Sequence, residues 1–117
     1  MTSMMEKLSA LEHDRWGRWQ AHLHSQCARN PDGSLTIPAG YVTNLERQIA
    51  TPYEQLTEEE KEHDRTEAHA VLDALQDPTD AMIDAGHQGF HQVGGKLVAP
   101  KPKVMFKAMI KAAGEEG

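Results

Sequence analysis

Apolar residues recur at helical spacing along most of the chain. Between positions 5 and 23 the steps from one apolar residue to the next are three, three, five, three and four. This spacing predicts a helix from about Ser3 to about Gln26. The apolar positions that define it are Met5, Leu8, Leu11, Trp16, Trp19 and Leu23. The two tryptophans are expected to form the centre of the core, and Gly17 between them indicates close approach of another backbone.

Two further helices follow in the first 77 residues. One is predicted from about Pro38 to about Ile49, after a turn at Asn30-Pro-Asp-Gly33. The other is predicted from Thr57 to about Leu75, where Thr57 and Glu60 have the spacing of a capping box. Its first half is polar, and its second half carries the apolar stripe Ala68, Val71, Leu72 and Leu75.

The last forty residues contain two shorter apolar patterns. Pro78 to Gly86 predicts a short helix with proline in its first turn and glycine past its end. Gly86 to Lys103 lacks a helical period and is expected to be a long loop, after which Pro102 opens a final helix. Both helices contain Ala-Met-Ile, and they are expected to pair with each other or to dock on a partner.

The fold class predicted from these patterns is all-α. We expect a compact three-helix core over residues 1–77, and a C-terminal appendage of two short helices over residues 78–117. The segment Ser34 to Ile37 is too short to predict a strand.

Charge narrows the classes of partner. The 117 residues carry a net charge of −6. Residues 1–77 have a net charge of −7, and the remainder has a net charge of +1. Nucleic acid is therefore not expected as a partner, because binding it requires clustered cations.

The predicted location is the cytoplasm. No apolar run approaches the ~20 residues needed to cross a bilayer, and Met1 to Ala10 lacks the pattern of a secretory signal. The single cysteine, Cys27, fits a reducing compartment.

No motif predicts catalysis. Among the seven histidines, His87 and His91 have the i,i+4 interval of a zinc-binding pair, but they flank Gly89 in a segment that is not expected to be helical. Neither a dinucleotide-binding nor a phosphate-binding glycine loop is present. The sequence predicts no enzyme activity, no cofactor and no metal.

Two motifs resemble the ryanodine-receptor (RyR) domain. They are His13-Asp-Arg-Trp16 and the long run from Thr51-Pro-Tyr to His-Asp-Arg65, and the likeness covers roughly residues 9–77. The Gly-Trp pair that usually follows the first helix in the channel repeats is missing after Trp19. The resemblance implies a compact helical module, found singly in small phage and bacterial proteins, for which nucleotide-like ligands have been proposed.

The matching residues leave two interpretations open. Asp64 and Arg65 could form a buried or half-buried hydrogen-bonded pair that supports the fold. Alternatively, arginine and aromatic side chains could bind the phosphate and base of a nucleotide. The ligand-binding residues expected in that case are Trp16, Trp19, Arg47, Tyr53 and Arg65.

The function expected is that of a non-catalytic binding module of phage or bacterial origin. It would recognise a small nucleotide-type ligand or a host protein, in an accessory or anti-defence role. The alternative is an adaptor protein that forms a homo-oligomer through its C-terminal helices.

Overall fold

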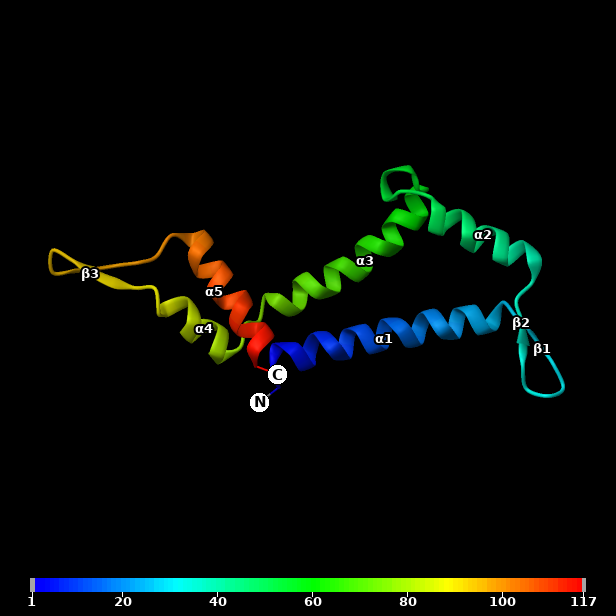
Figure 1. Cartoon of the computed structure of the whole chain (residues 1–117), viewed down its shortest axis with the longest axis horizontal. Helices are drawn as coiled ribbons and strands as arrows, with labels where there is room; N and C mark the ends of the chain where they lie inside the picture. The colour runs from blue at the N-terminus through cyan, green and yellow to red at the C-terminus, as the bar shows by residue number, and fades with distance from the viewer. Residues whose placement is uncertain (1, 117) are drawn as a thin grey trace. The chain divides into compact units, whose positions relative to one another are not determined.

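The structure is a computed structural model that describes residues 2–116. The chain is mostly helical, as expected (Figure 1). Within the described residues the elements follow one another as α1 (Met4–Ser25), β1 (Ala28–Arg29), β2 (Leu35–Thr36), α2 (Ala39–Ala50), the short 3₁₀ helix η1 (Tyr53–Gln55), α3 (Glu58–Leu75), α4 (Asp80–His87), β3 (His91–Val93), β4 (Lys96–Val98) and α5 (Pro102–Glu115). No helix of this part of the chain is long and apolar enough to span a membrane.

The starts of α1 and α3 follow from local hydrogen bonds. The Ser3 hydroxyl accepts the Glu6 amide at 3.1 Å. At α3 the predicted capping box is confirmed, because the Thr57 hydroxyl accepts the Glu60 amide at 3.2 Å and the Glu60 carboxylate accepts the Thr57 amide at 3.0 Å. The helix bounds predicted for α1, α2 and α3 agree with the structure within one residue.

Two antiparallel hairpins were not predicted, so the purely helical fold class needs correction. β1 pairs with β2 around the turn at residues 30–33, and β3 pairs with β4 inside the segment that was expected to be a loop. Gly94 and Gly95 have φ values of 57° and 79°. Two consecutive positive φ angles suit the tight turn of a two-residue hairpin, and Gly-Gly between strands was the missed signal.

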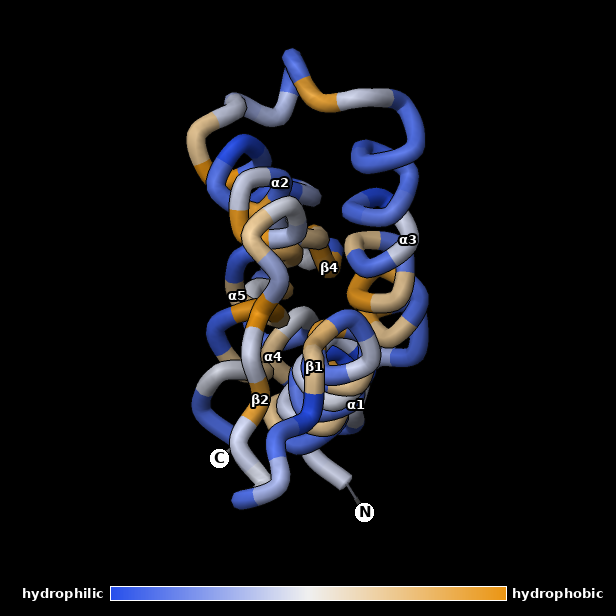
Figure 2. Tube along the Cα trace, turned by 90° about the vertical axis from the view of Figure 1, so that its right-hand side faces the viewer, coloured by the Kyte–Doolittle hydropathy of each residue, from blue (hydrophilic) through white to orange (hydrophobic). Residues whose placement is uncertain are grey.

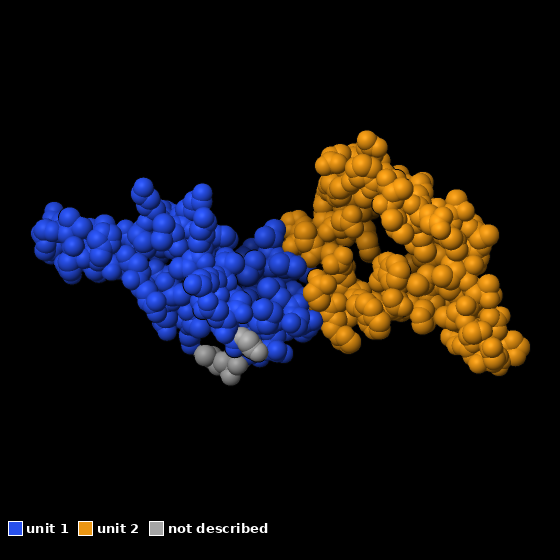
Figure 3. All heavy atoms as spheres, in the orientation of Figure 1, with its two compact units in different colours: residues 1–11, 70–117 blue, residues 12–69 orange. Residues whose placement is uncertain are grey.

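The chain divides into two compact units (Figure 3). Unit 1 comprises residues 1–11 and 70–117, and unit 2 comprises residues 12–69. The sequence pattern predicted a division at residue 77. The structure instead assigns the first turns of α1 and the end of α3 to the same unit as α4 and α5.

Unit 1 contains the small core of the molecule. Met4 and Met82 are 0% and 2% exposed, and Ala113 is also buried. Leu8, Leu75 and Met109 pack around these three residues. The prediction that Trp16 and Trp19 form the core is therefore wrong, because the core consists of methionine and small side chains.

Helices α4 and α5 lie side by side, which confirms the expected pairing of the two Ala-Met-Ile segments (Figure 1). A Cβ atom placed on Gly86 would lie 3.1 Å from Cγ and Sδ of Met109, so the glycine permits this close approach. The roles predicted for the ends of α4 need correction. Pro78 lies before the helix instead of in its first turn, Thr79 caps the helix by accepting the Met82 amide, and Gly86 lies within the helix.

Unit 2 has no buried residue anywhere in its 12–69 range, all of which the structure describes. A Cβ atom placed on Gly17 would meet no other atom within 4 Å, so the expected close approach at this glycine is wrong. Figure 2 shows why α3 contributes little apolar surface here: its first turns are hydrophilic, and apolar residues appear only toward its end.

Candidate functional site

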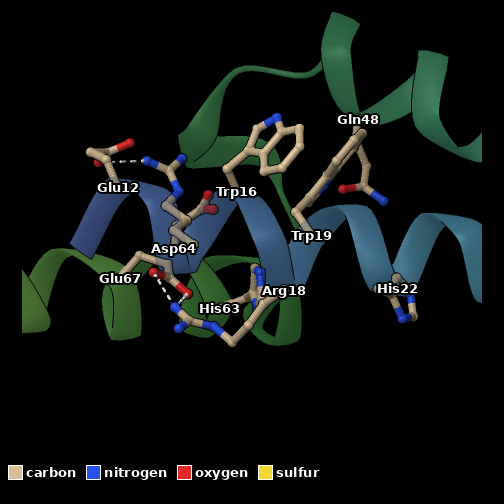
Figure 4. A pocket seen from close by; sticks show the side chains of 10 residues that line it. Glu12, Trp16, Arg18, Trp19, His22, Gln48, His63, Asp64 and Glu67 are labelled. Atoms are coloured by element: carbon tan, nitrogen blue, oxygen red, sulfur yellow. Dashed lines mark hydrogen bonds and ion pairs between the residues drawn. The ribbon is translucent and has the colours of Figure 1, made fainter. Parts of the chain in front are cut away.

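The two tryptophans of the chain lie three residues apart on α1 and remain exposed to solvent. Trp16 is 61% exposed and Trp19 is 47% exposed. His13 stacks against Trp16 with ring centres 6.2 Å apart and ring planes inclined by 20°. Figure 4 shows both indoles rising from the same side of α1, toward the helix that carries Gln48. An i,i+3 spacing places the two rings on neighbouring positions of the helix surface.

A cavity of about 540 Å³ opens beside these rings. Helices α1, α2 and α3 all contribute to its lining, and every lining residue belongs to unit 2. The lining residues are Glu12, Arg15, Trp16, Arg18, Trp19, His22, Gln48, His63, Asp64 and Glu67. The volume lies within the range of about 300–1,000 Å³ that is typical of small-molecule sites.

A second cavity of about 610 Å³ adjoins the first, since Trp19, His22, Gln48, His63 and Asp64 line both. We call the two together the tryptophan hollow; the space-filling view shows the opening in unit 2 (Figure 3). The residues that line the second cavity include no lysine or arginine. Its lining carries four carboxylates: Glu59, Glu60, Glu62 and Asp64.

The two arginines of the first cavity are already paired. Nη2 of Arg18 lies 3.0 Å from both carboxylate oxygens of Glu67, and Arg15 donates to Glu12 at 3.4 Å (Figure 4). Asp64 has no basic partner among the described residues. Three carboxylates therefore face two guanidinium groups in this cavity, and the tryptophan hollow is acidic.

Arg47 makes its contacts at the start of α3. Its guanidinium donates to the Glu60 carboxylate at 2.6 Å and to the Asn44 side chain at 3.0 Å. The same Glu60 closes the capping box with Thr57. The hydrogen bond from Arg47 lowers the pKa of Glu60, and the bond from the Thr57 amide acts in the same direction. Arg47 thus connects α2 to the cap of α3 and does not line the hollow.

Arg65 and Tyr53 also lie outside the tryptophan hollow. Nη1 of Arg65 donates to Glu58 at 3.2 Å and to Glu62 at 3.3 Å. The pKa of Arg65 is raised, first by Glu58, then by Glu62 and the Tyr53 hydroxyl. The Tyr53 ring is 44% exposed, and Nζ of Lys61 lies 5.8 Å from its centre. Arg65, Glu58 and Glu62 thus form an exposed ion-pair network on α3.

The expected hydrogen-bonded pair of Asp64 and Arg65 is not present. Both residues are exposed, and the Arg65 hydrogen bonds go to Glu58 and Glu62. Adjacent residues on a helix point in different directions, whereas residues three or four positions apart are neighbours. Asp64 faces the hollow, and Arg65 belongs to the network described above.

Of the five residues predicted to bind a ligand, only Trp16 and Trp19 line the tryptophan hollow, whereas Tyr53 and Arg65 lie together outside it. The role of the two tryptophans in binding stays a prediction, as does that of Arg47, Tyr53 and Arg65. The polar residues around the indoles were not predicted from the sequence. On α1 the missed signal is the stripe Glu12, Arg15, Trp19 and His22, with steps of three and four. Two histidines of the lining, His22 and His63, were considered only as metal ligands. Within residues 2–116 no group of three His, Cys, Asp or Glu side chains is arranged to hold a metal ion.

Comparisons with protein-family models, with curated proteins and with solved structures found no match to this chain. The resemblance to the RyR domain therefore stays a prediction.

Proposed function

We propose that this chain is a non-catalytic binding module and that its recognition site is the tryptophan hollow. The exposure of Trp16 and Trp19 beside an open cavity is the observation that supports this proposal. An indole side chain offers about 150–250 Å² of surface. At about 25 cal/mol per Å², covering the exposed part would contribute on the order of 2–3 kcal/mol for each ring.

The charges of the hollow favour one of the two expected ligand classes. A nucleotide phosphate needs an uncommitted cation, but Arg15 and Arg18 are each paired with a glutamate and the remaining carboxylates would repel an anion. A protein segment with basic and apolar side chains satisfies both features. Its lysines would approach the carboxylates and the faces of the indoles, and its apolar groups would cover the rings. We therefore favour a protein partner, such as a host protein bound in an accessory role, over a nucleotide.

The alternative function is that of an adaptor that forms oligomers through the C-terminal helices. The contact surfaces of α4 and α5 are occupied by each other within one chain. Helix α5 still exposes Val104, Phe106 and Ile110 at 54%, 63% and 38%. These residues support an adaptor role through the exposed surface of α5.

Intrinsic fluorescence tests the proposed site directly, because Trp16 and Trp19 are the two tryptophans of the chain and both line the hollow. The titrants are a lysine- and phenylalanine-containing helical peptide, its glutamate-substituted counterpart, a nucleoside and a nucleoside triphosphate. We expect the basic peptide to shift the emission to the blue and to raise the melting temperature. At 100 Kd, binding stabilises the folded chain by about 2.7 kcal/mol.

Two variants make the result specific. Asp64→Asn should weaken binding of the basic peptide, because it removes the unpaired carboxylate, whereas Arg65→Ala should leave binding unchanged, because Arg65 lies outside the hollow. A response to the triphosphate alone would support the nucleotide ligand instead. Unchanged emission with every titrant would contradict the binding-module proposal.

A further inference from the structure

Helix α5 carries a basic and apolar surface that does not contribute to the core of unit 1. Lys103, Lys107 and Lys111 recur every four residues and lie along one stripe of the helix. Phe106 and Ile110 form the adjacent stripe and are exposed. We call these five residues the basic face of α5. Met109 and Ala113, which lie on the other side of this apolar stripe from the lysines, belong to the core.

The basic face lies in a long segment without acidic residues. Residues 85–114 contain five lysines and no aspartate or glutamate. Unit 2 has the opposite character: residues 12–69 contain eleven acidic and six basic side chains, a net charge of −5. Lys103 and Lys107 form no ion pair among the described residues, whereas Nζ of Lys111 lies 3.9 Å from the Glu115 carboxylate. The lysines of the basic face and the negative charge of unit 2 are complementary for association.

The basic face cannot pair with its own equivalent in a second molecule, because the lysine stripes would repel each other. Three lysines spaced along one helix, one of them paired with Glu115, also lack the clustered cations that binding to nucleic acid requires. The matching surface needs carboxylates for the lysines and an aromatic lining for Phe106 and Ile110. The tryptophan hollow has both, with Glu59, Glu62 and Asp64 next to Trp19.

We propose that the basic face of α5 in one molecule occupies the tryptophan hollow of a second copy of this chain. A reciprocal exchange gives a closed dimer with two equal contacts. In each contact the lysines lie near the carboxylates and the indole faces, and Phe106 covers part of the indole surface. This inference rests on the proposed function, because it identifies the partner of the same hollow.

Sedimentation equilibrium of the full chain over a range of concentrations tests the proposal. The wild-type chain should dimerise, the dimer should weaken as salt is added, and tryptophan emission should shift to the blue as the dimer forms. Lys107→Glu should raise the dimer dissociation constant by about tenfold or more, because it places a carboxylate against the carboxylates of the hollow. Lys96→Glu, on β4 and outside the basic face, makes the same change of net charge and should have a much smaller effect.

A charge exchange separates loss of binding from loss of folding. Asp64→Lys should also weaken the dimer, and the double variant Lys107→Glu with Asp64→Lys should restore it, because the opposite charges again face each other in both contacts. A chain that stays monomeric, or a dimer that is insensitive to both single changes, would overturn the proposal. A monomer whose tryptophan emission still responds to the basic peptide would overturn the second-copy partner and leave the binding-module function supported.

Discussion

The two units bury their apolar residues in opposite ways. In unit 1, Met4 and Met82 are enclosed although a methionine side chain is flexible and unbranched. In unit 2, the large rings of Trp16 and Trp19 stay exposed, and the contacts described between α1, α2 and α3 include ion pairs such as Arg18–Glu67 and Arg47–Glu60. Exposed ion pairs contribute about 0–1 kcal/mol each. Unit 1 is therefore stabilised by burial, whereas unit 2 leaves the apolar surface of Trp16 and Trp19 exposed to solvent.

The largest expected effect comes from the core of unit 1. Replacing Met4 or Met82 by alanine should lower the free energy of unfolding by about 2–5 kcal/mol, because each change leaves a cavity among packed side chains. Met5→Ala is the matched control. Met5 follows Met4 on the same helix but is 40% exposed, so its replacement should cost much less. Equal losses for Met4 and Met5 in urea denaturation would contradict the position of the core.

Trp16→Ala tests whether the tryptophans of unit 2 are exposed. Because 61% of the residue is exposed, the change should lower the free energy of unfolding by about 1–2 kcal/mol. The same substitution in a core costs about 3–5 kcal/mol. Acrylamide should quench the emission of both tryptophans in the monomer, because solvent reaches both rings. A cost of 3 kcal/mol or more, together with resistance to quenching, would mean that unit 2 closes around its tryptophans.

Alanine substitutions at Gly17 and Gly86 test how much free space surrounds α1 and α4. Gly17→Ala in α1 should stabilise the chain by about 0.5–1 kcal/mol, because alanine favours the helix and the added methyl group meets no atom within 4 Å. Gly86→Ala in α4 should gain less or nothing, since the new Cβ would lie 3.1 Å from Met109 and that side chain must move. Thermal denaturation of the two variants measures the difference. Destabilisation by Gly17→Ala would show that another backbone does approach α1 at this position.

The sequence predicted what depends on neighbours along the chain. The capping box of Thr57 and Glu60 and the proline at the start of α5 are local signals, so the helix bounds could be read from them. Gly94-Gly95 is also a local signal, typical of the turn of a hairpin such as the one at residues 91–98, but a helical period in the apolar residues does not reveal it.

Burial and the site depend on contacts between distant segments, which periodicity does not determine. Trp16 and Met5 belong to the predicted apolar stripe of α1 and Met4 does not, yet only Met4 is enclosed, by Met82 and Ala113 far along the chain. The hydrogen-bond partners of the arginines likewise could not be predicted from periodicity. Arg65 matched a family motif, but its neighbours Glu58 and Glu62 already take its hydrogen bonds. Arg18 belongs to the cavity because Glu67, on another helix, is its partner.

The smallest effect concerns the polar contacts of unit 2 and depends on pH. Because Arg47 and the Thr57 amide lower the pKa of Glu60 in the folded chain, the ionised carboxylate stabilises the fold above the ordinary glutamate pKa, about 4.3. This contribution is lost as the pH falls through the lowered value. Glu60→Gln should therefore reduce the free energy of unfolding at pH 7, and its difference from the wild type should shrink on acidification below pH about 4.

Glu59→Gln is the matched control for this pH dependence. Glu59 shares the first turn of α3 with Glu60, so the two substitutions change the helix dipole interaction alike, but no hydrogen bond or ion pair of Glu59 side-chain atoms is present among residues 2–116. A pH-dependent difference specific to Glu60 in urea denaturation would show that the Arg47–Glu60–Thr57 contact holds α2 to α3. Identical curves for the two variants would mean that this contact contributes nothing measurable, and that the helices around the hollow are held by other forces, a bound partner among them.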